Sequence, residues 1–264
     1  MQKLRGHIYP EIIAIISHWL IWFSLAMRDI KLRYRRSTIG PFWITISTAI
    51  TIGSMGFLYG KLFHADLDFY FPYLASGIIG WSFLSSLINE SSQTFIESEH
   101  FIKNQASFLS IYNMRILIRN IIIFMHNLVV FIPIGLFFKT KIGLSILFLI
   151  PSIFIICCNI ITYGSILAIL GTRYRDFAQL VSSAIQIIFF LTPIMWMPNS
   201  LQISATWIIY CNPFYHFLNL IRAPLLNQSI TSTNIIVTLL VTCLGFILYY
   251  LFLPRYKHRI VFWL

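Results

Sequence analysis

The chain has 264 residues, of which 58% are hydrophobic and only 10% are charged, whereas soluble domains carry about 25% charged residues. Its mean hydropathy is +0.80, and apolar stretches of about 20 residues, long enough to cross a bilayer, recur along it. These values exclude a soluble globular enzyme, a disordered chain and a secreted disulfide scaffold. They predict a single all-α transmembrane domain that covers residues 1–264. Four cysteines, two of them adjacent, give no disulfide framework.

The first apolar segment, residues 12–27, is short, and a basic run from Arg28 to Arg36 follows it. Helical spacing puts apolar side chains on one stripe and Ser, Lys and Arg on the opposite one, so we expect residues 1–36 to form a cytoplasmic amphipathic interface helix. A seventh span and a cleaved signal peptide are the alternatives, and the basic run argues against export of this segment. The apolar stripe consists of Ile16, Leu20, Phe23, Met27, Ile30 and Tyr34.

Charge-free windows predict six spans inside a permease core of residues 37–253, followed by a cytoplasmic tail of residues 254–264. The window 177–221 is too long for one crossing, and prolines interrupt it. Its second part, about 198–228, therefore reads as a re-entrant or surface hairpin before the last span. The six predicted spans are 37–60, 69–89, 120–138, 142–172, 177–197 and 235–253.

The orientation of these spans follows from the basic residues. Of 19 Lys and Arg residues, four lie in the segments on one side, and the other 15 lie on the side of the termini. Basic residues concentrate on the cytoplasmic side, so both termini are predicted to be cytoplasmic in the inner membrane. The net charge of +11 is then mostly a consequence of topology, and no nucleic-acid partner is needed. The four outer residues are Lys61, Lys139, Lys141 and Arg222.

Several chemical motifs are missing from the sequence. It has no P-loop, no metal-ligand spacing of His and Cys, no nucleophile elbow and no catalytic pair of carboxylates in the loops. We also expect no buried Asp, Glu, Lys or Arg in the spans, so a proton-coupled or ion-coupled transporter lacks its usual charges. The chain is therefore predicted not to be an enzyme, and energy for transport has to come from a partner that hydrolyses nucleotide.

Residues 28–43 read Arg-Asp-Ile-Lys-Leu-Arg-Tyr-Arg-Arg-Ser-Thr-Ile-Gly-Pro-Phe-Trp, and this opening resembles that of the type-2 ABC-transporter permeases that export polysaccharides. Further similarities follow in order along nearly the whole chain, at 76–81, 101–103, 119–130, 174–177, 191–194 and 212–214. The chain departs from the family pattern at Ser47-Thr48, where an Asn-Pro pair and its kink are common, and near Ser107-Phe108, where a proline is missing.

The resemblance implies a fold and partners. Two copies of the chain would form the membrane pore, and two separate ABC subunits, which bind ATP and Mg²⁺, would dock beneath them. The cargo would be a glycan linked to polyprenyl diphosphate, most often O-antigen, moved from cytoplasm to periplasm. Capsule, teichoic acid, a drug or a lipid are alternative cargoes, and a membrane-embedded glycosyltransferase or polymerase is the alternative class. No cofactor is expected in this chain.

The candidate cargo contact is the basic run, because guanidinium groups bind phosphate oxygens in pairs. The same residues could instead anchor the helix on anionic lipid. The run consists of Lys31, Arg33, Arg35 and Arg36. A second candidate is the cytoplasmic connector 97–109, which could be a coupling helix for the ATPase or a solvated loop. Together with the next cytoplasmic turn it contributes Glu97, Glu99, Phe101, Lys103, Arg173, Arg175 and Asp176. Asp176 could also cap the fifth span and pair with Arg173.

The hairpin could act as a periplasmic gate, because irregular backbone at membrane depth must be buried or line water. A surface loop is the alternative. The proposed gate residues are Pro193, Pro198, Asn212 and Pro213. Aromatic rings could let sugar units slide along a pore, although most rings should face lipid. The candidate pathway aromatics are Phe42, Trp43, Tyr59, Phe189, Phe190 and Trp196. His126 and Asn127 are expected to hydrogen-bond neighbouring helices.

Overall fold

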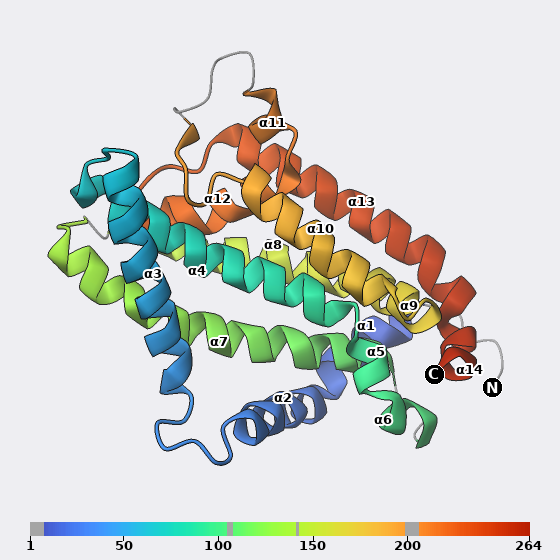
Figure 1. The fold of residues 1–264 in the computed structure, drawn as a ribbon. Coiled ribbons are helices and arrows are strands. Elements are labelled where there is room, and N and C mark those ends of the chain that lie inside the picture. The colour runs from blue at the N-terminus through green and yellow to red at the C-terminus, as the bar shows by residue number, and fades with distance from the viewer. Residues whose placement is uncertain (1–7, 105–107, 141–142, 199–205) are drawn as a thin grey trace.

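The structure is a computed structural model that describes residues 8–104, 108–140, 143–198 and 206–264. The described residues form helices and connecting turns (Figure 1). Parts of the predicted connector and hairpin, residues 105–107 and 199–205, lie outside the described residues, as does Lys141. An all-α membrane protein is thus confirmed, and its chain passes back and forth through one bundle (Figure 1).

Five described helices are long and apolar enough to cross a bilayer, and each overlaps a predicted span. They are α3 (Phe42–Leu62), α4 (Leu67–Ser91), α7 (Ser110–Phe137), the composite helix Leu144–Arg173 and the helix Ser232–Trp263, which begins with α13 (Ser232–Tyr256). The composite helix contains η1 (Leu144–Phe148), α8 (Leu149–Asn159), η2 (Ile160–Gly164) and α9 (Ser165–Arg173).

The remaining predicted span, 177–197, is a shorter helix, α10 (Phe177–Leu191), with 15 residues. At 1.5 Å per residue it is about 22 Å long, less than a hydrocarbon core of about 30 Å. Pro193 has no N–H to continue the helix, and the chain leaves the helix at Thr192. The expected hairpin is represented by α11 (Trp207–Tyr210) and α12 (Pro213–Leu225), which packs against α4, α8 and α13.

The N-terminal segment forms two helices instead of one, α1 (Ile8–Ser17) and α2 (Trp19–Arg33), with a bend of 66° between them. The predicted apolar stripe is therefore not one continuous face: Ile16, Leu20 and Phe23 are exposed, whereas Ile30 is buried. Both helices pack against α7. Their placement in the membrane interface stays a prediction.

The first described helix, α1, and the C-terminal end of the chain lie at the same end of the bundle, beside α5 (Thr94–Glu97) and α6 (Glu99–Asn104) (Figure 1). The tail is packed there: α14 (Ile260–Trp263) follows η5 (Lys257–Arg259), and Ile260 is fully buried with Phe95, Ile102 and Tyr249. The main core lies further along the bundle, where α4 is the most enclosed of the long helices. We call the end with α1 and α14 the terminal end and the opposite one the far end.

Candidate functional site

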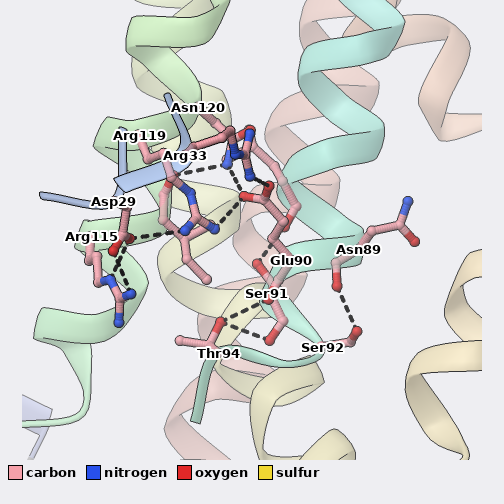
Figure 2. Close-up of polar contacts among 12 residues, drawn as sticks. Asp29, Arg33, Asn89, Glu90, Ser91, Ser92, Thr94, Arg115, Arg119 and Asn120 are labelled. Carbon is pink, nitrogen blue, oxygen red and sulfur yellow. Dashed lines mark hydrogen bonds and ion pairs between the residues drawn. The ribbon is translucent and has the colours of Figure 1, made fainter. Parts of the chain in front are cut away.

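An ion network joins α2 to α7 at the terminal end (Figure 2). Asp29 of α2 accepts two hydrogen bonds from Arg115 of α7, with Nε–Oδ2 at 2.6 Å and Nη2–Oδ1 at 2.7 Å. Arg119, one turn further along α7, also reaches Asp29, with Nη1–Oδ2 at 2.9 Å. The i,i+4 spacing of the two arginines puts both on the face of α7 that meets α2. Paired contacts of this kind are strong and fix the geometry.

The network continues to α4 through Glu90 (Figure 2). Arg119 donates from Nη2 to Glu90 Oε2 at 2.8 Å, and Asn120 donates to the same oxygen. Arg33 of α2 lies 3.7 Å from Glu90 Oε1. Arg119 of α7 is therefore shared by one carboxylate from α2 and one from α4, so these three helices are held together by charge.

The side chain of Arg119 is only 8% exposed and that of Asp29 only 12%. The sequence-based expectation that no charged residue is buried in a span is therefore wrong for α7. The physical reason is compensation, because a buried charge is tolerated when an opposite charge and hydrogen bonds satisfy it. The charge-free window missed this: Arg115 and Arg119 lie before the predicted span at 120, but the helix begins at Ser110.

The connector at the terminal end is attached to this network. Arg115 donates from Nη1 to Oγ of Ser98, which lies between α5 and α6, at 3.3 Å. The guanidinium of Arg28 lies 5.7 Å from the ring centroid of Phe101 in α6. Desolvation raises the pKa of Glu97 at the end of α5, despite the attraction of Arg119 and Arg115. A displacement of α5 and α6 would therefore act directly on α7 through Ser98 and on α2 through Phe101.

The structure brings the seven predicted coupling residues to the terminal end. They lie in α5 and α6, and at the end of α9 with the turn that follows it. Glu99 and Lys103 form an exposed i,i+4 ion pair at 2.6 Å, and this pair lowers the pKa of Glu99. Phe101 is half-buried, and Ile102 is buried beneath it in the core. The turn between α9 and α10 exposes Arg173, Arg175 and Asp176, and α5 packs on α9.

The predicted cap at Asp176 is only partly right. Asp176 does occupy the N-cap position of α10, but its side chain makes no capping hydrogen bond. It forms no ion pair with Arg173 within the part of the chain that the structure describes. The guanidinium of Arg173 instead lies over the rings of Tyr174 and Trp263, at 5.2 and 5.3 Å from the centroids.

The candidate cargo contacts lie at the end of α2 and just beyond it. Arg33 pairs with Glu90. Lys31, Arg35 and Arg36 are exposed and form no ion pair with any other described residue. These three charges are available to a phosphate, whether it belongs to a cargo or to a membrane lipid.

At the far end, the break after α10 is held by side chains of α4 and α12. Tyr70 donates to the carbonyl of Met195 at 2.7 Å, and Tyr73 donates to that of Pro193 at 2.9 Å. Arg222 of α12 donates from Nη1 to the same Pro193 carbonyl at 2.8 Å. Carbonyl groups that leave a helix at membrane depth need such donors because no water satisfies them. We call residues 192–197 the far-end turn.

Arg222 itself was expected in an outer loop, and the structure buries it almost completely, with 3% exposed. Its guanidinium lies 4.0 Å from the ring centroid of Tyr73 and near the carboxyl end of α10, where the helix dipole favours a cation. Its Nε and Nη2 have no hydrogen-bond partner in the described chain. A Cβ at Gly77 would lie 2.3 Å from Nη2, so a larger residue there would force the guanidinium to shift.

The proposed gate residues meet in part at this turn. Asn212 donates from Nδ2 to Thr192 Oγ1 at 2.9 Å and accepts from Phe214 N at 3.0 Å, so it caps α12 and holds the far-end turn at once. Pro213 is the first residue of α12, where its missing N–H costs nothing. Pro193 supplies the carbonyl bound by Arg222. Pro198 lies at the edge of the described segment. A gating movement stays a prediction.

The candidate pathway aromatics do not form one surface within a single chain. Phe42 and Trp43 are exposed at the start of α3, and Tyr59 stacks on Phe63 at its other end. The other three gather near the far-end turn: Phe189 contacts Trp81 and Phe190, and Trp196 donates to the Phe190 carbonyl at 3.2 Å.

Asn127 and His126 both hydrogen-bond α3 as predicted, but His126 does so only through its carbonyl, which accepts from Thr45 Oγ1 at 3.3 Å. Thr48 of α3 donates to Asn127 Oδ1 at 2.8 Å. The Nδ1 of His126 instead contacts the carbonyl of Ile122 in its own helix at 2.9 Å. Thr48 stands where the family often has a proline, and α3 is continuous from Phe42 to Leu62. At this position α3 therefore has a hydrogen bond to α7 and no proline kink.

Taken together, the bundle is a multi-span α-helical membrane protein with a charged joint at one end and a hydrogen-bonded turn at the other. No group of three or more His, Cys, Asp and Glu that could hold a metal occurs among the described residues. Residues 21–226 match the family described as ABC-2 type transporter. The chain therefore belongs to the ABC-2 type transporter family.

Two relatives with a described function are similar to the chain. Both are described as O-antigen export system permease protein RfbA from Klebsiella pneumoniae, and they are 26% and 24% identical to this chain over 188 residues. Each alignment covers 70% of this chain and 72% of the relative. Family and relatives place the chain among the membrane permeases of ABC transporters, which are transport components.

Proposed function

We propose that the chain is the membrane permease of an ATP-driven exporter that moves a lipid-linked O-antigen glycan from the cytoplasm to the periplasm. The observation that carries the proposal is the similarity to O-antigen export permeases over 70% of the chain. The terminal end is then cytoplasmic, because basic residues concentrate there. In this proposal the protein lies in the inner membrane with both termini in the cytoplasm.

In this proposal, two copies of the chain surround the pathway, and two ATP-binding subunits, which hold ATP and Mg²⁺, contact α5, α6 and the α9–α10 turn. The contact of Arg115 with Ser98 and the pairs of Arg115 and Arg119 with Asp29 and Glu90 support a mechanical role. A push on α5 would move α7 and α2 together, because the Arg115–Ser98 hydrogen bond joins α7 to the end of α5 and ion pairs join α7 to α2. The predicted result is a change of the pathway between the two copies.

The polyprenyl diphosphate would approach the exposed charges of Lys31, Arg35 and Arg36 beside membrane lipids. Arg→Lys at 33, 35 and 36 keeps the positive charge but removes the planar fork that binds phosphate in pairs. If these residues bind cargo, the variant assembles normally and glycan accumulates inside the cell. Normal export at normal protein levels would leave them only an anchoring role.

A deletion tests the function as a whole. Cells without the chain should retain lipid-linked glycan in the cytoplasm and lack it at the surface, and the wild-type gene should restore export. A surface glycan unchanged by the deletion would contradict the proposal. If glycan synthesis itself stopped, with no intermediate accumulating, a membrane-embedded synthase would be favoured instead.

A further inference from the structure

An apolar cavity of about 470 Å³, partly open to the outside, lies between α4, α8, η2, α9, α12 and α13. Leu84 and Ile88 of α4 form one wall, Leu167 of α9 and Leu244 of α13 form others, and Phe214 and Phe217 of α12 close the side nearer the far end. Figure 1 shows that these helices come from distant parts of the chain. The cavity is distinct from the ion network, since no residue of that network lines it.

The walls present hydrocarbon. Asn159 and Tyr163 are the polar residues of the lining, and both direct their donors to α13. Asn159 Nδ2 donates to Thr242 Oγ1 at 2.7 Å, and the Tyr163 hydroxyl donates to the Val241 carbonyl at 2.9 Å. These two bonds also hold the π-helical turn η2 against α13, so the cavity has a fixed wall. Such π turns occur frequently at functional sites.

The volume matches a hydrocarbon chain. An apolar cavity of about 150 Å³ accommodates one benzene molecule. By that measure a cavity of about 470 Å³ holds roughly three such rings, or about 18 carbon atoms. A water-filled cavity would need several polar partners, whereas Asn159 Oδ1 is the one polar side-chain atom of the described lining that is buried without a hydrogen-bond partner.

A positively charged residue near the cavity, Arg173, indicates which kind of lipid provides the hydrocarbon chain. Arg173 ends α9 six residues beyond Leu167, about 9 Å further toward the terminal end. Its side chain is exposed and forms no ion pair with another described residue. The basic run expected to meet the cargo lies instead at the end of α2, which packs on α7.

We propose that this cavity binds one acyl chain of an anionic glycerophospholipid, with the lipid phosphate near Arg173. Because α12 closes the cavity and begins with Pro213 next to Asn212, the bound chain supports the helix that holds the far-end turn. This consequence for transport rests on the proposed gate, whereas the lipid site itself does not.

The test is native mass spectrometry of the full chain, released from nanodiscs that contain phosphatidylglycerol and phosphatidylcholine. The wild type should retain a single phosphatidylglycerol per chain. Leu244→Trp, which fills the cavity, should lower retention roughly tenfold. The matched control is Leu240→Trp, one turn earlier on α13; both leucines are exposed, but Leu240 does not line the cavity, so this variant should retain the lipid.

Arg173→Gln should keep lipid bound but lose the preference for phosphatidylglycerol over phosphatidylcholine. If Leu244→Trp cannot be purified, the wild-type preference and Arg173→Gln still decide the matter. The proposal is overturned if the wild type retains no lipid, if both tryptophan variants retain lipid equally, or if polyprenyl phosphate added to the nanodiscs displaces phosphatidylglycerol. None of these outcomes depends on glycan export, so failure here leaves the proposed function standing.

Discussion

Asp29 is the residue on which the charged joint depends most, because it accepts hydrogen bonds from both Arg115 and Arg119. Asp29→Asn keeps the shape but leaves two largely buried cations short of a negative charge. We expect a loss of about 3 kcal/mol in the free energy of unfolding, the low end of the range for breaking a buried pair. Thermal unfolding of the purified chain in detergent measures it.

The control for this change is Glu99→Gln, which breaks the exposed pair with Lys103. Exposed pairs of this kind contribute little, so no measurable change in the unfolding midpoint is expected. Equal effects of the two substitutions would mean that the joint around Asp29 is no more important than a surface ion pair.

The packing of Arg222 on Gly77 gives a second prediction for a single residue. In most helices Gly→Ala is stabilising, but a Cβ here would lie 2.3 Å from Arg222 Nη2. Gly77→Ala should lower the free energy of unfolding by about 1–3 kcal/mol through overpacking. Gly53→Ala in α3, where a Cβ would meet nothing within 4 Å, should instead raise it by about 0.5–1 kcal/mol.

A double-mutant cycle assigns that effect to the arginine. Arg222→Lys removes Nη2, so Gly77→Ala combined with it should cost less than the sum of the two single changes. Strict additivity in thermal unfolding would show that the alanine clashes with something other than the guanidinium.

Among the elements, α6 carries exposed residues and is attached to the core through Ile102. Phe101 is half-buried beside Arg28, and Ile102 anchors the helix from below. Phe101→Asp should abolish recovery of the ATPase subunit with the affinity-tagged chain, because it places a charge in an apolar contact. Phe101→Leu keeps the apolar surface and should retain the partner. Full recovery of the ATPase with Phe101→Asp would remove α6 from the interface.

Prediction from the sequence was most accurate for helices whose whole length is apolar. Five spans appear in the charge-free windows because lipid requires apolar side chains along a whole helix. The start of α7 at Ser110 could not be predicted that way, because Arg115 and Arg119 read as loop charges until Asp29 and Glu90 are seen beside them.

Arg222 shows the same limit more strongly. Its partner Tyr73 is 149 residues away in the chain, so no local pattern announces the contact. The coupling residues were proposed because the sequence puts them in predicted cytoplasmic turns next to helix ends. The residues that join those turns to the bundle were not, since their role depends on which helices pack together.

For the molecule as a whole, the fold predicts which cysteines an impermeant reagent can reach. Cys211 is exposed at the far end, beyond α11. In a chain whose other three cysteines are replaced by serine, Cys211 should react in intact cells. A cysteine placed at Arg175, in a chain that also lacks Cys211, should react only after permeabilisation. The reverse pattern would invert the orientation assigned from the basic residues.

The central claim is that this permease moves a lipid-linked glycan by using ATP hydrolysed in a partner, and reconstitution tests it most directly. The purified chain and its ATPase subunit are placed in liposomes with radiolabelled polyprenyl-diphosphate glycan. The fraction of glycan on the side away from the ATPase is then measured with and without ATP and Mg²⁺. We predict ATP-dependent transfer with the wild type and little with the Phe101→Asp chain. Equal transfer without ATP, or none with the intact complex, would contradict the account.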